Sequence, residues 1–239
     1  MSVMEMIKPK QYVAELSEVK EIAPEIKLFT FNMGEEFKFK PGQFVIVEWE
    51  EGKEVLKRAY SVCSSGKSKE IKLCMNIVPC GKFTPKLNSL SIGGKIFMNG
   101  PYGFFGKELS ELDNEIVFIA TGTGIAPLKS MLNSLFNRGF NKKITLLYGF
   151  RYAENFLFKE ELEKLAKNHS NFELVTTVSR PKSKEKWQGN IGRVTNLLDK
   201  YSKQNIDYYI CGLGDMVKDI KTKLLENGIE RTKIHVEAW

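Results

Sequence analysis

The stretch IVFIATGTGIAPL, residues 116–128, constrains the fold of this chain more than any other part of it. It begins with an unbroken apolar run, which is typical of a strand buried on both faces of a parallel sheet. Gly122 and Gly124 follow, and glycine lets the backbone turn sharply and approach a ligand closely. Helical spacing of apolar residues starts at Ile125, and Pro127 fits the first turn of a helix, where no N–H is needed. We therefore expect a turn that binds the pyrophosphate of a dinucleotide, because unpaired N–H groups and the helix dipole both favour an anion.

Two other interpretations of this turn are open. A strand-to-helix turn in an α/β domain can serve the fold alone and bind nothing. A short-chain dehydrogenase also carries a T-G-x-x-G turn, but usually near the start of the chain. Here a region of different composition, residues 1–110, precedes the turn, which argues against that class.

The hydrophobic pattern changes near Asp113. Before it, short runs rich in β-branched and aromatic residues are separated by Gly, Pro or charged turns, which predicts an antiparallel β-barrel with one short helix near 83–90. After it, buried strands alternate with amphipathic helices, which predicts a doubly wound parallel sheet. We therefore expect two domains, 1–110 and 111–239, with the boundary in the polar stretch 107–114. The expected strands are 12–19, 26–31, 43–48, 56–62, 70–77, 95–98, 116–120, 144–149, 172–178, 207–211 and 233–236, and the expected later helices are 125–138, 158–168, 193–201 and 215–227.

Composition limits the class of protein. No apolar run is long enough to span a membrane, and residues 1–11 lack the apolar centre of a secretory signal, so we expect a soluble cytoplasmic protein without membrane insertion. The cysteines form no C-x-x-C pair and there are only 2 histidines, so we expect reduced thiols, no metal site and no fused iron–sulfur domain. The net charge of +7 is spread along the chain, which argues against nucleic-acid binding but suits an acidic protein partner.

Two motifs in the first domain carry groups that bind phosphate or a planar ring. Arg58-Ala59-Tyr60-Ser61 combines an arginine fork for a pyrophosphate, a flat tyrosine ring and a serine hydroxyl that can bond to a ring nitrogen. Gly81-Lys82-Phe83-Thr84 precedes the expected short helix and is a second candidate anion site. Each motif alone also fits an ordinary solvated strand or turn. Together with the turn at 121–124, they favour two nucleotide cofactors that meet between two domains.

In this combination of motifs the chain resembles the ferredoxin-NADP reductase family of flavoproteins. The resemblance covers nearly the whole chain, so the ordered set is stronger evidence than any single motif. The matching elements are R-x-Y-S at 58–61, G-x-x-T at 81–84, Gly100-Pro101-Tyr102-Gly103, residues 121–127, Tyr148-Gly149-Phe150-Arg151, Cys211-Gly212 and an aromatic C-terminal residue.

The resemblance implies a site for FAD in the first domain. By similarity, Arg58 and Thr84 hold the FAD pyrophosphate, Tyr60 stacks on the isoalloxazine and Ser61 faces its hydride-accepting nitrogen. Cys74-Met75-Asn76 falls where the family contacts the flavin, with a looser match. The implied FAD-binding residues are Arg58, Ala59, Tyr60, Ser61, Cys74, Met75, Asn76, Gly81, Lys82, Phe83, Thr84 and Trp239.

The resemblance also implies a hydride-transfer site in the second domain. A cysteine that ends a buried strand is usually a small core residue, but in the family the position of Cys211 lies beside the nicotinamide carbon that donates hydride. Glu237 matches a carboxylate that serves proton transfer around the ring, and Trp239 matches an aromatic lid on the flavin, where plant-type members have tyrosine. The implied catalytic residues are Ser61, Cys211 and Glu237. The implied NAD(P)-binding residues are Thr121, Gly122, Thr123, Gly124, Pro127, Arg151, Ser179, Arg180, Cys211, Gly212 and Leu213.

Coenzyme preference depends on the loop after the expected strand 172–178. Ser179 and Arg180, followed by Lys182, Lys184 and Lys186, would bind a ribose 2′-phosphate, whereas an acidic residue there would favour plain ribose. A solvated basic loop is the alternative interpretation. We expect NADP(H), with NAD(H) as the other choice.

The sequence thus predicts an FAD-dependent oxidoreductase that exchanges hydride with NADP(H) and single electrons with an acidic ferredoxin or flavodoxin. Two alternatives stay open: an NADH-dependent reductase component, and a flavin-binding electron-transfer subunit of a larger complex. The cysteine cluster of a dihydroorotate dehydrogenase electron-transfer subunit is missing from this sequence, which argues against that subunit.

Overall fold

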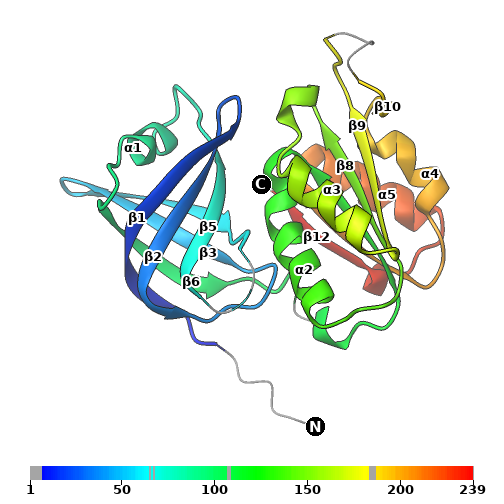
Figure 1. Cartoon of the computed structure of the whole chain (residues 1–239), viewed down its shortest axis with the longest axis horizontal. Helices are drawn as coiled ribbons and strands as arrows, with labels where there is room; N and C mark the ends of the chain where they lie inside the picture. The colour runs from blue at the N-terminus through cyan, green and yellow to red at the C-terminus, as the bar shows by residue number, and fades with distance from the viewer. Residues whose placement is uncertain (1–6, 65, 67, 107–108, 183–186, 239) are drawn as a thin grey trace. The chain divides into compact units, whose positions relative to one another are not determined.

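The computed structural model describes residues 7–238 except 65, 67, 107–108 and 183–186. These residues form two compact units (Figure 1). The first unit extends to Leu109 and includes Lys129–Ser134, and the second comprises Ser110–Leu128 and the residues from Leu135 onward.

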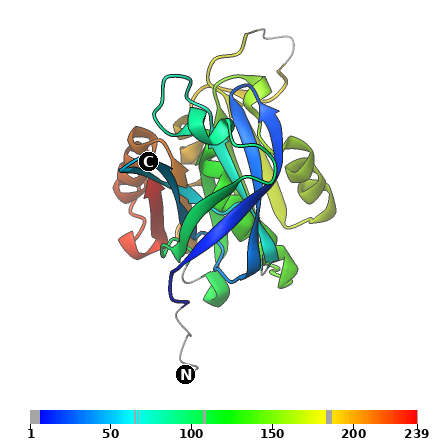
Figure 2. The same ribbon diagram turned by 90° about the vertical axis from the view of Figure 1, so that its left-hand side faces the viewer.

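The first unit is an antiparallel barrel. Its strands lie in the order β4-β3-β6-β1-β2-β5, and Figure 2 shows β1 and β2, in blue, running side by side. An antiparallel bridge between Val62 and Leu73 joins the chain just after β4 to β5, so the two ends of this order meet. The predicted antiparallel fold is therefore confirmed. The strands are β1 (Lys10–Ala23), β2 (Ile26–Phe37), β3 (Phe44–Glu51), β4 (Glu54–Ser61), β5 (Ser68–Asn76) and β6 (Lys95–Tyr102).

The interior of the barrel holds aromatic side chains from alternating positions, such as the fully buried Phe29 and Phe31 of β2. The short helix α1 (Thr84–Asn88) adds Leu87 and the preceding Phe83 to the same core. Burying these two side chains contributes roughly 1.5–3 kcal/mol each. This packing fixes α1 near β4, because Tyr60 of β4 contacts the same core.

The last barrel strand is longer than the sequence predicted. We expected a strand over 95–98, and Gly100 and Pro101, which follow it, are residues that usually interrupt strands. β6 instead continues to Tyr102, with Gly100 opposite Lys10 and Tyr102 opposite Phe44. Pairing with strands on both sides overrides the local preference of these two residues.

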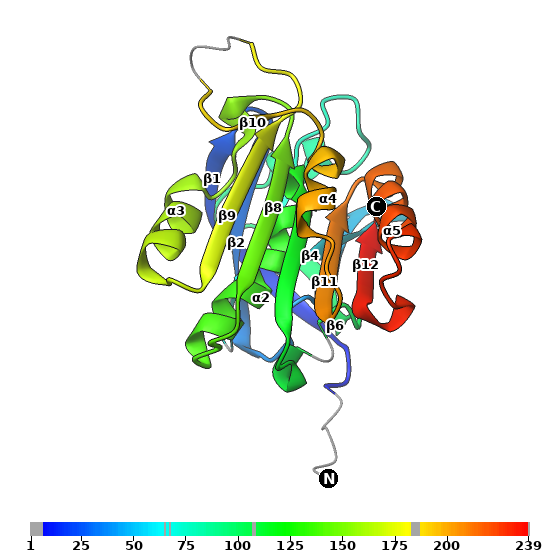
Figure 3. The same ribbon diagram turned by 90° about the vertical axis from the view of Figure 1, so that its right-hand side faces the viewer.

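The second unit is a parallel sheet in the order β10-β9-β8-β7-β11-β12, and Figure 3 shows its strands side by side. The order reverses at β7, so the carboxyl ends of β7 and β11 flank the switch point where ligands bind in such sheets. The doubly wound fold is therefore confirmed. The strands are β7 (Glu115–Thr121), β8 (Ile144–Phe150), β9 (Phe172–Val178), β10 (Asn190–Ile191), β11 (Ile206–Gly212) and β12 (Ile234–Ala238).

Helices cover both faces of this sheet (Figures 1 and 3). Helix α2 (Ile125–Asn137) lies on one face, whereas α4 (Leu198–Tyr201) and α5 (Gly214–Glu226) pack on Ile119 and Ile210 of the other. Helix α3 (Lys159–Asn168) precedes β9. A helical segment occupies the position predicted at 193–201, but it begins as a 3₁₀ turn, Val194–Leu197, and only its last residues are α-helical. Among the residues described, no helix is long and apolar enough to cross a membrane.

Candidate nucleotide-binding and hydride-transfer site

The two predicted motifs of the barrel lie together. β4 carries Arg58–Ser61 to the end of its strand, and the ring of Tyr60 lies 6.1 Å from that of Phe83, just before α1. The Thr84 hydroxyl accepts a hydrogen bond of 2.9 Å from the Val78 N–H, which fixes the loop that leads into α1. Burial raises the pKa of Tyr60 to about 12, while the Arg58 charge opposes that shift. Tyr60 is therefore a neutral ring at physiological pH.

A cavity of about 450 Å³ lies beside α1 and the β3–β4 hairpin. Such a volume falls within the range of small-molecule and cofactor sites. Lys82 and Lys86 line it together with the carboxylates Glu51 and Glu54, and Lys86 forms an ion pair with Glu51. Leu56 of β4 also lines the cavity, and Arg58, two residues further along that strand, is exposed. The cavity has the size of a cofactor site, and the motif at 58–61 adds the Arg58 charge and the Tyr60 ring surface.

The remaining barrel candidates have different surroundings. Met75 is buried in the barrel core, so its backbone alone can face a ligand. Cys74 is also buried, and burial raises the pKa of its thiol well above the ordinary value. Asn76 and Ala59 are exposed, and Ser61 is half-buried at the end of β4.

In the second unit, the turns after β7 and β11 pack directly against each other. A Cβ on Gly124 would collide with the carbonyl oxygen of Cys211, and one on Gly212 would collide with the Thr121 hydroxyl. Only glycine permits this approach. The Thr121 Oγ1 atom is buried and has no hydrogen-bond partner among the described residues. A buried hydroxyl without a partner at a glycine turn fits a ligand that carries acceptor oxygens.

The rest of this turn follows the expected arrangement with one addition. Gly122–Gly124 forms a 3₁₀ turn before α2 begins at Ile125, and the Tyr148 hydroxyl donates a hydrogen bond of 3.0 Å to the Gly122 carbonyl. Pro127 is buried in the first turn of α2, and Thr123 is half-buried.

Cys211 and Glu237 are neighbours across β11 and β12. They occupy matching register positions, and the Cys211 Sγ lies 3.9 Å from the Glu237 Oε1. Burial raises the pKa of the Cys211 thiol well above its ordinary value, and the Glu237 carboxylate raises it further. Cys211 is therefore a neutral thiol, unlike the thiolate of a nucleophilic cysteine. After it, Leu213 is 61% exposed at the start of α5.

Arginines follow three neighbouring strands of the parallel sheet. Arg151 follows β8 and Arg180 follows β9, and the Arg180 N–H donates a hydrogen bond of 2.8 Å to the Arg151 carbonyl. Arg193 follows β10, where the preceding Gly192 N–H bonds to the Val178 carbonyl. All three arginines are exposed. Sequence reasoning missed Arg193, because β10 is only two residues long, although the Gly-Arg pair before a helical segment was a usable signal.

The structure changes the interpretation of two other groups in this loop. The Ser179 hydroxyl donates a hydrogen bond of 3.4 Å to the Phe150 carbonyl. The Lys182 ammonium forms an ion pair of 2.6 Å with Glu154 and lies 4.8 Å from the centre of the Tyr152 ring. Lys182 therefore already has a carboxylate partner. Lys184 and Lys186 lie outside the described residues, as does Trp239.

Two further observations concern metal ligands and thiols. Within the part of the chain that the structure describes, no group of three or more His, Cys, Asp or Glu side chains is placed to hold a metal ion. Cys63, Cys74, Cys80 and Cys211 are all free thiols.

Two family models match the chain: the oxidoreductase FAD-binding domain over residues 13–106 and the oxidoreductase NAD-binding domain over residues 118–222. Sulfhydrogenase 2 subunit gamma of Pyrococcus furiosus is 33% identical, with 95% of this chain and 83% of that protein aligned. Ferredoxin–NADP reductase B of Sorangium cellulosum is 31% identical, over 98% of this chain and 100% of that protein. The crystal structure of a ferredoxin NADP⁺ reductase from Neisseria gonorrhoeae, with FAD and NADP bound, matches 98% of this chain and 99% of its own with a TM-score of 0.83 and 25% identity.

Proposed function

Because the chain belongs to the ferredoxin-NADP reductase family of flavoproteins, we propose that it transfers electrons between NADP(H) and a small acidic redox protein, such as ferredoxin or flavodoxin. It is an oxidoreductase with an FAD-binding and an NAD(P)-binding domain. The observation that carries the hydride-transfer part of this proposal is the Cys211–Glu237 pair beside the glycine turn at the switch point of the parallel sheet.

The barrel residues hold the FAD in this proposal. The Arg58 guanidinium binds the pyrophosphate as a charged fork, and the Thr84 hydroxyl, whose oxygen already accepts from Val78, donates its proton to the same group. The neutral Tyr60 ring stacks on the flavin. Ser61 orients the flavin by a hydrogen bond to its ring nitrogen. The cavity next to α1 accommodates the remaining part of the cofactor.

The residues of the parallel sheet bind and orient the coenzyme. Backbone N–H groups of Gly122–Gly124 and the buried Thr121 hydroxyl bind its pyrophosphate. When bound, FAD accepts a hydride from the nicotinamide and passes the electrons on singly. Cys211, as an uncharged thiol, packs beside the nicotinamide without repelling the transferred hydride. Glu237 holds and releases the proton that accompanies the electrons.

The exposed arginines favour NADP(H) over NAD(H). Arg151 and Arg180 follow adjacent strands and share a backbone hydrogen bond, so both exposed residues lie at the carboxyl edge of the sheet. Guanidinium groups bind phosphate through paired hydrogen bonds. Arg193 follows the next strand and adds a third positive charge. We assign the ribose 2′-phosphate to this arginine group.

An anaerobic titration of the purified protein with NADPH tests the proposal. The flavin absorbance band should bleach at near-stoichiometric NADPH, and the reduced protein should then reduce an added ferredoxin. Purified protein that contains no flavin, or whose flavin is bleached by neither NADPH nor NADH, would refute the reductase assignment. Bleaching by NADH alone would move the coenzyme assignment to NAD(H).

A second candidate function is supported by the relative from Pyrococcus furiosus, which is a subunit of a sulfhydrogenase. In that case this chain is a flavin-binding electron-transfer subunit. Co-purification with a second chain at fixed stoichiometry, together with turnover that rises when the two are combined, would favour this function over a free reductase.

A further inference from the structure

The strand that carries Glu237 has a neighbouring strand on one side only, among the residues that the structure describes. β12 spans Ile234–Ala238 and is the edge strand, paired in parallel with β11. Its apolar Ile234 packs into the core with α5, whereas Val236 is 38% exposed. A shift of β12 by two residues would keep the same side chains on each face, because strand side chains alternate with a period of two. Backbone pairing and the apolar pattern therefore do not by themselves select which residue lies beside Cys211.

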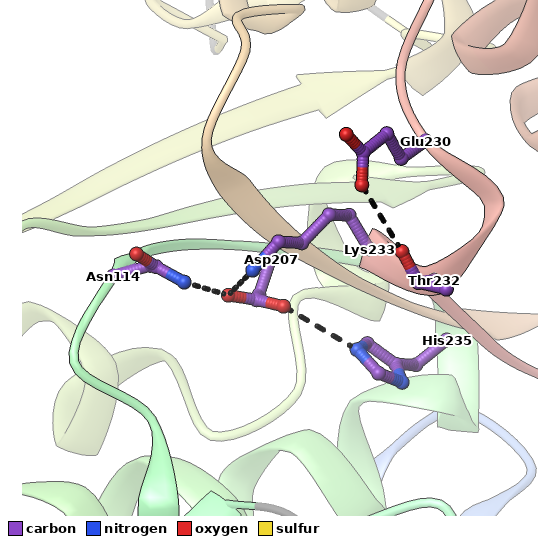
Figure 4. Close-up of polar contacts among 6 residues, drawn as sticks. All are labelled: Asn114, Asp207, Glu230, Thr232, Lys233 and His235. Atoms are coloured by element: carbon purple, nitrogen blue, oxygen red, sulfur yellow. Dashed lines mark hydrogen bonds and ion pairs between the residues drawn. The ribbon is translucent and has the colours of Figure 1, made fainter.

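A buried carboxylate at the other end of β11 supplies the missing constraint (Figure 4). Asp207 is 3% exposed, and its Oδ2 accepts hydrogen bonds from Asn114 Nδ2 at 2.9 Å and from Lys233 Nζ at 3.3 Å. Its Oδ1 lies 3.6 Å from His235 Nε2, within ion-pair distance of a protonated ring. Asp207 thus connects the residue before β7, the residue before β12 and β12 itself.

A stacking contact between two aromatic rings also restrains β12, at His235. His235 lies opposite Tyr209 in the register, and the two rings stack with centroids 4.3 Å apart and an angle of 14°. His235 and Glu237 are two residues apart, so they share a face of β12, as Tyr209 and Cys211 share a face of β11. A contact that fixes His235 over Tyr209 therefore also places Glu237 next to Cys211.

The turn before β12 is ordered by a separate contact. Thr232 donates a hydrogen bond of 3.3 Å to Glu230, and both side chains lie in the loop that leads to Lys233 (Figure 4). Thr232 and Glu230 are exposed, whereas Asp207 is buried. A single exposed hydrogen bond contributes only about 0.5–1.5 kcal/mol, whereas buried Asp207 has three polar contacts and is the stronger polar restraint on this end of β12.

We propose that Asp207, acting through Lys233 and His235, is the positioning residue that fixes the register of β12 and so holds the Glu237 carboxylate beside Cys211. The link to catalysis rests on the proposed function, in which Glu237 handles the proton at the hydride-transfer site. The structural part of the inference does not depend on that function.

Hydrogen exchange measured by mass spectrometry tests the structural part. Asp207→Asn and Lys233→Met each weaken the contact from one side, and Asp199→Asn is the matched control, because Asp199 forms an ion pair with Lys223 that does not involve β12. We expect amides of β12 to exchange about tenfold faster in the first two variants, with β8 and β9 unchanged, since exchange reports local opening. Exchange equal to that of the control would overturn the proposal, and so would acceleration throughout the sheet. If Asp207→Asn does not fold, the exchange rates of β12 in Lys233→Met test the proposal instead.

A double-mutant cycle tests the link to Glu237. We expect Asp207→Asn to lower kcat for NADPH oxidation by a neutral quinone about tenfold, with KM changed less than about twofold, and to have almost no effect when Glu237→Gln is already present. An equal effect in both backgrounds would show that Asp207 does not act through Glu237. Absence of NADPH and NADH oxidation in the wild type would refute the proposed function, while the exchange experiment would still decide whether Asp207 fixes the strand.

Discussion

Arg180 offers the most direct test of coenzyme preference at the residue scale. Its backbone is fixed by the hydrogen bond to Arg151, so replacing its side chain removes charge with little effect on the loop. Arg180→Ala should weaken NADPH binding by about 1.5–3 kcal/mol, the range for hydrogen bonds to charged groups, and NADH binding far less. Dissociation constants of both coenzymes, measured by flavin difference spectra, would show this, with the exposed Arg138 replaced by alanine as the control. Equal weakening of both coenzymes would place the 2′-phosphate elsewhere.

Asp207 predicts a specific acid response. Burial alone would raise the pKa of its carboxyl, but the contacts with His235 and Asn114 and the Lys233 charge outweigh burial and hold that pKa below its ordinary value. A carboxyl whose pKa is lowered by folding stabilises the protein above the unfolded-state pKa of about 3.9, and this stabilisation is lost as the pH falls through the lower folded-state value. The free energy of unfolding, measured with urea, should therefore be higher in wild type than in Asp207→Asn above about pH 5. That difference should shrink as the pH falls below about 4, and a difference that keeps its full size as acid is added would contradict the assignment.

The sequence could not reveal this cluster. Asn114, Asp207 and the Lys233–His235 segment lie far apart along the chain, and only the pairing of β7, β11 and β12 brings them together. The Cys211–Glu237 contact has the same origin, which is why only resemblance to a family suggested it. By contrast, Arg58, Tyr60 and Thr84 belong to short motifs, so their chemistry was visible in the sequence, although the Tyr60–Phe83 contact was not.

At the scale of elements, the glycine turn at the switch point should be intolerant of any side chain. Gly124→Ala would place a Cβ against the Cys211 carbonyl and should cost about 1–3 kcal/mol of unfolding free energy, the usual effect of overpacking. It should also weaken NADPH binding, because the turns after β7 and β11 must separate. Gly214→Ala is the control, since a Cβ there meets open space at the start of α5 and should leave stability unchanged or slightly higher. Similar urea midpoints for the two variants would mean that the close approach is not a constraint.

Element types followed from the sequence more reliably than element ends. The runs of β7, β8 and β11 are mostly apolar and almost entirely buried, so their pattern alone identified parallel strands. β10 was not predicted, because it exists only through pairing with the end of β9. The order of strands in each sheet was likewise beyond any local pattern, since it depends on contacts between distant segments.

For the whole molecule, the excess of positive charge is the property that bears on the redox partner. The net charge is +7, and a field of that sign speeds encounter with an acidic protein by about 10–10³-fold at low salt. The steering fades when the Debye length falls from about 30 Å at 0.01 M salt to about 3 Å at 1 M. The second-order rate of ferredoxin reduction, measured by stopped flow, should therefore fall steeply as salt is raised over this range. The rate with a neutral quinone acceptor should change little, because no field acts on an uncharged molecule. A ferredoxin rate that does not depend on salt would argue against an acidic partner and favour the function of a subunit bound within a larger complex.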